Sequence, residues 1–150
     1  VALVGRIHAR GGVALVQPYL ADVDSSGETA VVFLGGTISH VVRKRAILRA
    51  DEVAPAAPDG VGRELEVAHA MFDDDLVVPG DAAPDDLRFA ERLLAEVSER
   101  FEAPLYLRVD LVRNAAGSPV QLELEAIDPV LYLELTPGAD RTFAAAVLAS

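Results

Sequence analysis

LYLRVD at Leu105–Asp110 and QLELE at Gln121–Glu125 are the two stretches that decide the fold of this chain. Successive side chains of an extended strand point to opposite faces, so leucine and valine share one face of each stretch and charged residues share the other. The connecting RNAAGSP at Arg113–Pro119 supplies the asparagine, glycine and proline that a chain reversal needs. The sequence therefore predicts an antiparallel hairpin with one apolar and one polar face.

The register of this hairpin follows from its centre. If the reversal centres near Ala116, Asp110 lies opposite Glu123 and Arg108 lies opposite Glu125. The predicted apolar face consists of Leu105, Leu107, Val109 and Leu111 on the first strand and Val120, Leu122, Leu124 and Ala126 on the second. Like charges directly across a ladder destabilise a sheet, so the Asp110–Glu123 pair needs a compensating group.

Two explanations of this polar face remain open on spacing alone. A Mg²⁺ ion would compensate the carboxylates of Asp110, Glu123 and Glu125, because it prefers oxygen ligands and is commonly held by carboxylates together with phosphates. An antiparallel sheet with one solvated face shows the same alternation, and Arg108 would then simply pair with Glu125.

Composition limits the classes of protein to which the chain can belong. Its 150 residues suffice for one domain with a sizeable core, and 51% of them are hydrophobic. A net charge of -11 argues against nucleic acid and anionic membranes as partners. The chain has no cysteine, which excludes disulfides and thiolate zinc sites, and no segment has the pattern of a membrane span or signal peptide. We expect a cytoplasmic protein, and the start at Val1 without methionine predicts a piece of a longer polypeptide.

Further strands are predicted in the first third of the chain. Val13–Leu20 has the composition of a strand that ends near Pro18, and Asp22–Gly27 has that of a turn. Thr29–Leu34 and Thr37–Leu48 flank Gly35-Gly36, a strong hairpin signal. That hairpin would place Phe33 opposite Ile38, Val31 opposite His40, and Glu28 near Arg43.

Helices are predicted in the second half. Pro84 begins a pattern of apolar residues at helical spacing that reaches Phe101, with Asp85 and Asp86 in its first turn. A last helix is predicted from Thr136–Pro137 through Val147. Asp51–Gly62 has loop composition, and Arg63–Phe72 fits either a strand or a short helix. The whole pattern predicts an α+β class with a mainly antiparallel sheet and flanking helices.

The polar residues of the C-terminal hairpin resemble those of a known family. Arg108-Val109-Asp110, followed by Glu123-Leu124-Glu125 and Pro129, is similar to the C-terminal metal-binding signature of ATP-grasp ligases. The resemblance implies that Asp110, Glu123 and Glu125 bind the Mg²⁺ ions that bridge the ATP phosphates. It also implies that Arg108 contacts the transferred phosphoryl group or the acyl substrate. Glu125 stands where asparagine is commoner in the family.

The resemblance continues upstream. Val16–Leu20 looks like the strand and hinge that face adenine, which implies nucleotide contacts from Gln17, Tyr19 and Leu20. Glu28 looks like the acidic residue that engages the ribose, and Lys44 is the candidate for contact with a phosphate. The similarity is greatest to the glutathione-synthetase-like and actinobacterial amino-acid-ligase branches. It implies that residues 1–150 form a single domain, the C-terminal half of an ATP-grasp fold, and that the two phosphate-binding lysines of that fold precede Val1.

The implied activity is an ATP- and Mg-dependent ligation. A small-molecule carboxylate would be phosphorylated to an acylphosphate, from which an amine or a related nucleophile displaces phosphate; homodimerisation is left open. Such chemistry needs positioning and charge neutralisation rather than a side-chain nucleophile, so the lack of cysteine is no obstacle. Two other classes remain: a non-catalytic relative used for protein association, and a plain acidic α+β domain.

Other polar residues have simpler explanations. His40, on the predicted face of Ile38 and Val42, is better explained as a histidine at the edge of the core than as a ligand or a general base. Asp73-Asp74-Asp75 is better explained as a solvated turn than as a cation site, because side chains of consecutive residues diverge.

Overall fold

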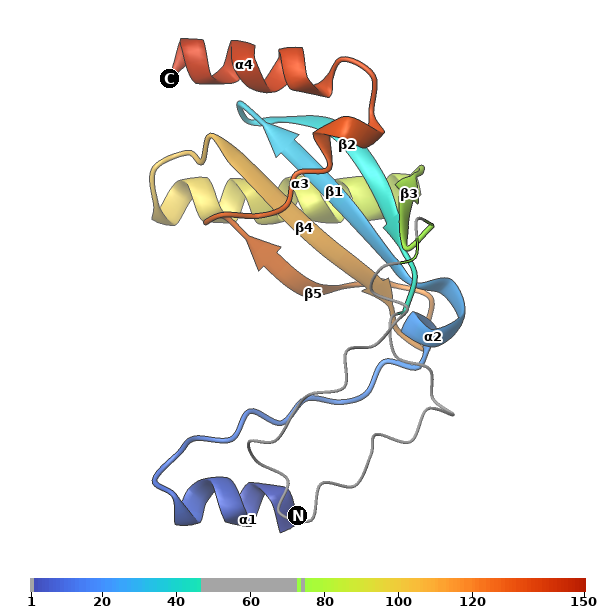
Figure 1. Cartoon of the computed structure of the whole chain (residues 1–150), viewed down its shortest axis with the longest axis vertical. Helices are drawn as coiled ribbons and strands as arrows, with labels where there is room; N and C mark the ends of the chain where they lie inside the picture. Colours follow the sequence, from blue (N-terminus) through green and yellow to red (C-terminus); the bar gives the residue numbers. More distant parts are fainter. Residues whose placement is uncertain (1, 47–72, 74) are drawn as a thin grey trace.

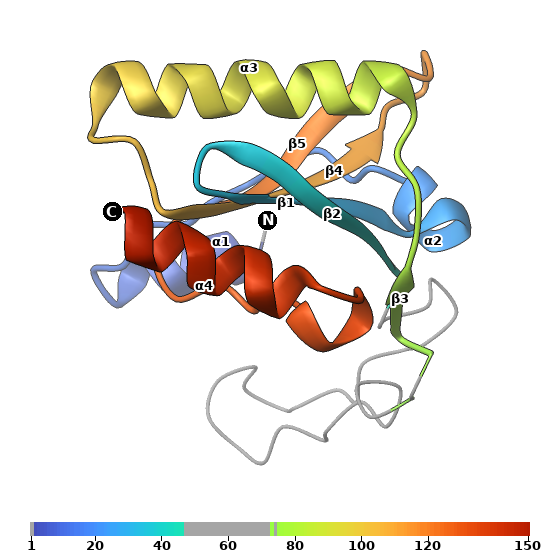
Figure 2. The same ribbon diagram turned by 90° about the horizontal axis from the view of Figure 1, so that it is seen from above.

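The computed structural model describes residues 2–46, 73 and 75–150. Within these residues the chain forms one antiparallel sheet of five strands in the order β3-β2-β1-β4-β5. Helix α3 covers one face of the sheet and α4 lies over the other, as Figures 1 and 2 show. The predicted α+β class with a mainly antiparallel sheet and flanking helices is therefore confirmed.

The strands and helices of the described chain range from the three-residue β3 to the 17-residue α3. The strands are β1 (Glu28–Leu34), β2 (Thr37–Lys44), β3 (Val77–Pro79), β4 (Tyr106–Arg113) and β5 (Pro119–Glu125). The helices are α1 (Ala2–Ala9), α2 (Asp22–Ser26), α3 (Pro84–Arg100) and α4 (Ala139–Ala149), with the short 3-10 helix η2 (Leu133–Leu135) before α4.

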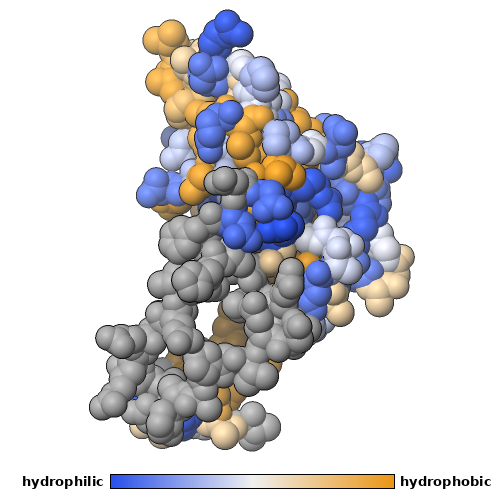
Figure 3. Space-filling view, turned by 45° about the vertical axis from the view of Figure 1, so that its right-hand side comes forward, coloured by the Kyte–Doolittle hydropathy of each residue, from blue (hydrophilic) through white to orange (hydrophobic). Residues whose placement is uncertain are grey.

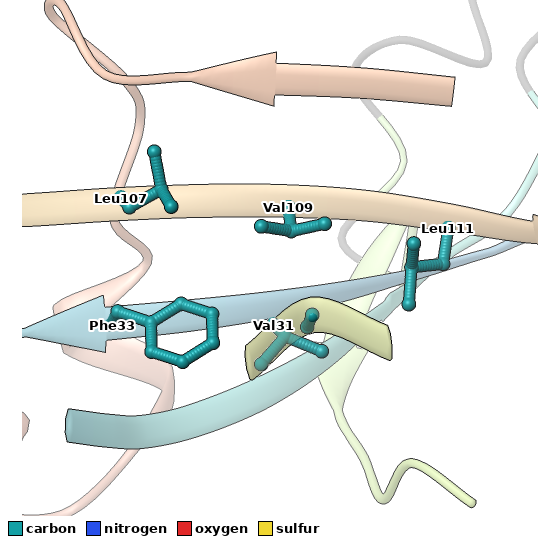
Figure 4. Packing of buried hydrophobic residues seen from close by; sticks show 6 residues of the cluster. Val31, Phe33, Leu107, Val109 and Leu111 are labelled. Atoms are coloured by element: carbon teal, nitrogen blue, oxygen red, sulfur yellow. The ribbon is translucent and has the colours of Figure 1, made fainter. Parts of the chain in front are cut away.

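The core lies between the sheet and α3. Alternate residues of β1 and β4 point toward the helix, and Ala90 of α3 packs against them (Figure 4). The strand residues of this cluster are Val31, Phe33, Leu107, Val109 and Leu111. Burying one such side chain is worth about 1.5–3 kcal/mol, so this layer fixes which face of each strand is left for polar residues.

A bulge in the β1–β2 hairpin changes part of the predicted register. Phe33 does pair with Ile38, but Val32 rather than Val31 pairs with His40, because Ser39 is an extra residue between the two pairs. Glu28 consequently lies opposite Lys44, one residue beyond the predicted Arg43. The predictions for Val31 and for Glu28 were therefore wrong by one residue.

A second bulge affects β5. The predicted pairs Asp110–Glu123 and Arg108–Glu125 are confirmed, but the register shifts at Leu122 and sets Val120 opposite Val112. Val120 therefore shares the face of Asp110, and its predicted place on the apolar face was wrong. Leu124 and Ala126, on the side of the bulge away from the turn, pack against the core as predicted.

The N-terminal part differs most from prediction. Val13–Leu20 forms no strand, and Val13 is 94% exposed; an isolated extended segment is stable only beside a hydrogen-bonded neighbour, and no described strand pairs with it. The predicted turn at Asp22–Gly27 is the short helix α2, which Gly27 ends at φ 66. A Cβ at Gly27 would lie 2.1 Å from the Lys44 carbonyl oxygen, so only glycine fits there.

The remaining predictions agree with the structure to within a few residues. Helix α3 begins at Pro84 as predicted but ends before Phe101, which is largely exposed. Helix α4 begins three residues later than Thr136. The strand predicted for Thr37–Leu48 ends at Lys44, and the segments predicted at Asp51–Gly62 and Arg63–Phe72 lie outside the described residues.

The surface has a hydrophobic end. In Figure 3 hydrophobic residues gather at the top of the molecule, at the level of α4 in Figure 1. Val147 and Leu148 of that helix are 45% and 89% exposed. Among the residues that the structure describes, no helix is both long enough and apolar enough to span a membrane.

Candidate metal centre

Three carboxylates converge on the sheet face opposite α3. Asp110 comes from the middle of β4, and Glu123 and Glu125 come from the neighbouring β5. Each offers one oxygen, and these oxygens all lie within 4.8 Å of one another. The Asp110 side chain is completely buried, whereas that of Glu123 is 53% exposed. The cluster therefore has a buried base and an accessible rim.

Arg108 lies beside the cluster. Its Nε donates to Asp110 Oδ1 at 3.0 Å, and its Nη2 donates to Asp110 Oδ2 at 2.9 Å and to Glu125 Oε1 at 2.5 Å. Its Nη1 donates to the carbonyl of Val130 at 2.9 Å, and the Tyr132 ring centroid lies 5.5 Å from its Cζ. Burial disfavours the charged guanidinium, but hydrogen bonds and charge from Asp110 outweigh it and raise the pKa of Arg108.

Lys44 is the second cation. Its Nζ lies 2.7 Å from Asp110 Oδ2 and 2.6 Å from Glu28 Oε2, so it bridges β4 and β1. Burial would lower the pKa of Lys44, yet hydrogen bonds to Asp110 and Glu28 raise it overall. The bulge at Ser39 makes this contact possible, because it brings Lys44 opposite Glu28.

The charges of the site do not balance. The carboxylates of Glu28, Asp110, Glu123 and Glu125 meet the two cations Lys44 and Arg108, which leaves an excess of two negative charges in this cluster. Partial burial and the neighbouring Asp110 raise the pKa of Glu123. Hard oxygen ligands with a double excess of negative charge are a donor set that suits one divalent cation such as Mg²⁺.

Burial speaks against a merely solvated hairpin face. The Arg108–Glu125 pair that the simpler explanation requires is present. Arg108 and Asp110 are only 4% and 0% exposed, however. The chain after β5 contacts Arg108, and Arg108 and Lys44 contact Asp110. Burying charges costs free energy unless they are paired and hydrogen-bonded. An ion pair on a solvated face would stay exposed and would not incur this cost.

The residues predicted to contact the nucleotide line two adjoining pockets. Tyr19, Glu28 and Lys44 border a cavity of about 420 Å³ that also reaches Tyr132. Gln17 and Leu20 line a neighbouring groove of about 300 Å³ over Val112 and Val120, and Tyr19 borders both. The structure thus brings Glu28 and Lys44 next to the carboxylate cluster, whereas Gln17 and Leu20 lie apart from it. The Tyr19 hydroxyl donates to Asp24 at 2.5 Å, and this bond raises the pKa of Tyr19.

Some residues around the cluster could not be found from sequence patterns. Tyr132 and the carbonyl of Val130 contact Arg108 from a segment without regular structure, where no periodicity marks a role. His40 is buried as expected of a histidine at the core, but the bulge places it on the Lys44 side of β2 and not with Ile38. Asp73 and Asp75 pair with the exposed Arg45, in agreement with a solvated turn.

Comparison with known proteins relates this chain to a synthetase. No family model matches the chain. It is 34% identical over 149 residues to the cycloserine biosynthesis protein DcsG of Streptomyces lavendulae, covering 96% of this chain and 44% of that protein. The chain is similar to DcsG. The crystal structure of D-cycloserine synthetase DcsG matches it with a TM-score of 0.73 at 33% identity, over 99% of this chain and 46% of the other.

These matches show the fold but cover only part of each relative. The α+β arrangement described above is shared with the DcsG structure, and the similarity agrees with the resemblance to ATP-grasp ligases. The chain spans less than half the length of these relatives. A crystal structure of the macrocyclase MdnC of Microcystis aeruginosa, bound with precursor peptide MdnA, matches at 16% identity with a TM-score of 0.43 over 81% of this chain and 29% of the other, too low for any inference.

Proposed function

We propose that this chain supplies the metal centre and part of the ATP site of a ligase that joins a small carboxylate to an amine or a related nucleophile through an acylphosphate. The observation that carries the proposal is the cluster of Asp110, Glu123 and Glu125 beside the buried Arg108. The similarity to a D-cycloserine synthetase supports a ligase, and it favours the amino-acid-ligase branch over the glutathione-synthetase-like one.

Each residue has a role in this proposal. Asp110, Glu123 and Glu125 hold Mg²⁺, which neutralises phosphate charge when it is bound. Arg108 is hydrogen-bonded to Asp110 and lies 3.8 Å from Glu123 at the accessible rim, where its charge stabilises the group in transfer. Lys44 contacts a phosphate, for which it exchanges one of its carboxylate partners.

The nucleotide would occupy the cavity beside the cluster. Glu28 at its edge accepts hydrogen bonds from the ribose hydroxyls, and Tyr19 packs against the base. Gln17 and Leu20, in the adjoining groove, contact the far side of the base. We further propose that residues 1–150 are one domain of a longer ligase, because DcsG is more than twice as long as the part that this chain matches.

Calorimetry of Mg²⁺ with ADP tests the metal centre. We expect binding to the protein that Glu123→Gln weakens at least about tenfold, because a carboxylate ligand is lost, and that Asp110→Asn abolishes. Glu91→Gln is the matched control, since Glu91 is an exposed carboxylate of α3 on the opposite face of the sheet. Thermal unfolding of each variant verifies that it is folded. Equal binding by Glu123→Gln and the unchanged protein would end the metal assignment.

Turnover tests the ligase itself. The full-length ligase of which residues 1–150 are proposed to be one domain should release ADP from ATP only when a suitable carboxylate and amine are both present. ADP release that no acceptor alters would instead indicate adventitious hydrolysis, and it would contradict the proposed ligation.

A further inference from the structure

A short strap crosses the sheet face that carries the carboxylate cluster of Asp110, Glu123 and Glu125. We use this name for Asp128–Tyr132, which leads from β5 to η2 and in Figure 1 runs in front of β4. The carbonyl of Val130 accepts from Arg108 Nη1 at 2.9 Å, and the Tyr132 ring stacks near the same guanidinium. The strap thus forms one wall of the Arg108 site.

The strap adopts a conformation that it would not choose by itself. Asp128 and Tyr132 have φ values of 57 and 52, a region that costs non-glycine residues free energy. The strap itself forms neither a helix nor a strand, so regular backbone hydrogen bonds do not stabilise it. Contacts with the sheet must therefore hold it in place, and besides Arg108 the sheet contributes His40.

His40 anchors the strap from the other side. Its Nε2 lies 2.8 Å from the carbonyl oxygen of Leu131, and because a carbonyl only accepts, Nε2 carries the proton and donates it. Nδ1 lies 2.9 Å from Ser39 Oγ, whose hydroxyl can donate to it. The residue is only 7% exposed, and within the described part of the chain both ring nitrogens bond to Ser39 and Leu131 rather than to the clustered carboxylates. Both polar atoms of the ring therefore serve to fix the ring and the strap.

We infer that His40 is a positioning residue: through the backbone of Leu131 and Val130 it holds the strap against Arg108 and so orients the guanidinium toward the reacting group. Arg108 uses Nε and Nη2 on Asp110 and Glu125, and Nη1 on the strap. With the strap displaced, Nη1 loses its acceptor, and the guanidinium keeps only its bonds to Asp110 and Glu125, so its orientation is less firmly fixed. The catalytic part of this inference rests on the role proposed for Arg108; the positioning itself does not.

Hydrogen exchange at one atom measures the positioning. The Nε–H resonance of Arg108 in a ¹⁵N spectrum is assigned by its disappearance in Arg108→Lys. In His40→Met we expect this proton to exchange about fivefold faster than in the unchanged protein, the effect of one lost hydrogen bond. In His40→Gln, whose amide reaches the position of Nε2, exchange should stay near its original rate. If His40→Met does not fold, His40→Asn replaces it, since its shorter amide does not reach Leu131.

A matched control separates positioning from general destabilisation. Leu94→Ala removes core packing between α3 and the sheet without touching the strap. It should speed the exchange of Arg108 Nε–H only by the factor by which it speeds the exchange of the backbone amides of β1 and β4. The inference is overturned if His40→Met leaves Arg108 Nε–H unchanged, or if it accelerates that proton and the β1 and β4 amides equally.

Turnover then connects positioning to chemistry. We expect His40→Met to lower kcat for ADP release about fivefold with little change in KM for ATP, and to have no further effect in an Arg108→Lys background, because it acts through Arg108. An additive loss in the double variant would overturn the catalytic link. A lack of turnover in the unchanged full-length ligase would contradict the proposed function alone, while the exchange experiment would still decide the role of His40.

Discussion

Lys44 pairs with carboxylates in the structure, and in the proposed complex it would also contact a phosphate. Its ammonium group lies between Glu28 and the buried Asp110, so without a metal it neutralises part of the carboxylate cluster. In the proposed complex the same group contacts a phosphate. In this proposal Lys44 competes with a metal ion for Asp110 and also assists the binding of a nucleotide.

Removing Lys44 should shift the two affinities in opposite directions. In Lys44→Met we expect Mg²⁺ alone to bind about three- to tenfold more tightly, because a repelling cation is gone, and Mg²⁺ with ADP to bind more weakly than in the unchanged protein. Calorimetry at one ionic strength measures both. Arg45→Met is the control, because Arg45 pairs instead with Asp73 and Asp75. Weaker binding of Mg²⁺ alone by Lys44→Met would show that Lys44 supports the site rather than competes in it.

Not all site residues were equally accessible to prediction. Arg108, Asp110, Glu123 and Glu125 sit on two regular strands, where a period of two assigns their common face from sequence alone. Tyr132 sits in an irregular segment, and its approach to Arg108 depends on contacts between distant parts of the chain. Local patterns contain no information on such contacts.

Bulges limit what the pattern of a strand can predict. One extra residue reverses the faces of all residues beyond it, and neither Ser39 nor Leu122 differs in type from an ordinary strand residue. In the β1–β2 hairpin the register was predicted correctly between the turn and Ser39 and wrongly beyond it. In the β4–β5 hairpin it was predicted correctly beyond Leu122 and wrongly between the turn and that bulge, as Val120 shows. Helix α3 was easier, because Pro84 and the acidic first turn mark its start locally.

An ion-pair cluster joins the start of α3 to the end of β4. Arg113 donates to Asp85 at 2.9 Å through both terminal nitrogens and to Asp86 at 2.7 Å. Asp86 in turn accepts the backbone N–H of Ala83. The cluster holds the first turn of α3 against the C-terminal end of β4, where Arg113 pairs with Pro119.

This cluster should show in the pH dependence of stability. The hydrogen bond from Arg113 lowers the pKa of Asp85 from 3.8 to about 2, so Asp85 stabilises the fold above its unfolded pKa and the contribution is lost as the pH falls toward 2. Asp85→Asn should therefore lower the urea midpoint at neutral pH, with a gap that narrows from pH 4 downward. The effect should be small, because the side chain is 42% exposed.

The control for Asp85→Asn is a carboxylate elsewhere on the same helix. Glu96→Gln changes an exposed residue of α3 well beyond its first turn, and its urea midpoint should follow that of the unchanged protein at every pH. A gap for Asp85→Asn that stays constant on acidification would mean that the Arg113 contact does not depend on the charge of Asp85.

For the molecule as a whole, the excess of negative charge among the clustered carboxylates is part of a net charge of -11. Self-repulsion of this size opposes the compact state, and any salt relieves it by screening. A specific metal site stabilises by a different law, because an ion that binds only the folded state contributes about 2.7 kcal/mol at a hundredfold excess over its Kd. The two effects separate when chloride salts are compared at matched ionic strength.

We expect MgCl₂ to raise Tm above the value in KCl of equal ionic strength, by about 2–4 °C for each kcal/mol of binding free energy. Glu123→Gln should lose this excess but keep the rise that KCl produces, because it removes a ligand and only one of 24 acidic residues. Glu91→Gln makes the same change of charge on the opposite face and should retain the Mg²⁺ excess. If all three proteins respond to MgCl₂ as they do to KCl, Mg²⁺ acts on this chain by screening alone, and the clustered carboxylates are held by Arg108 and Lys44 without a metal.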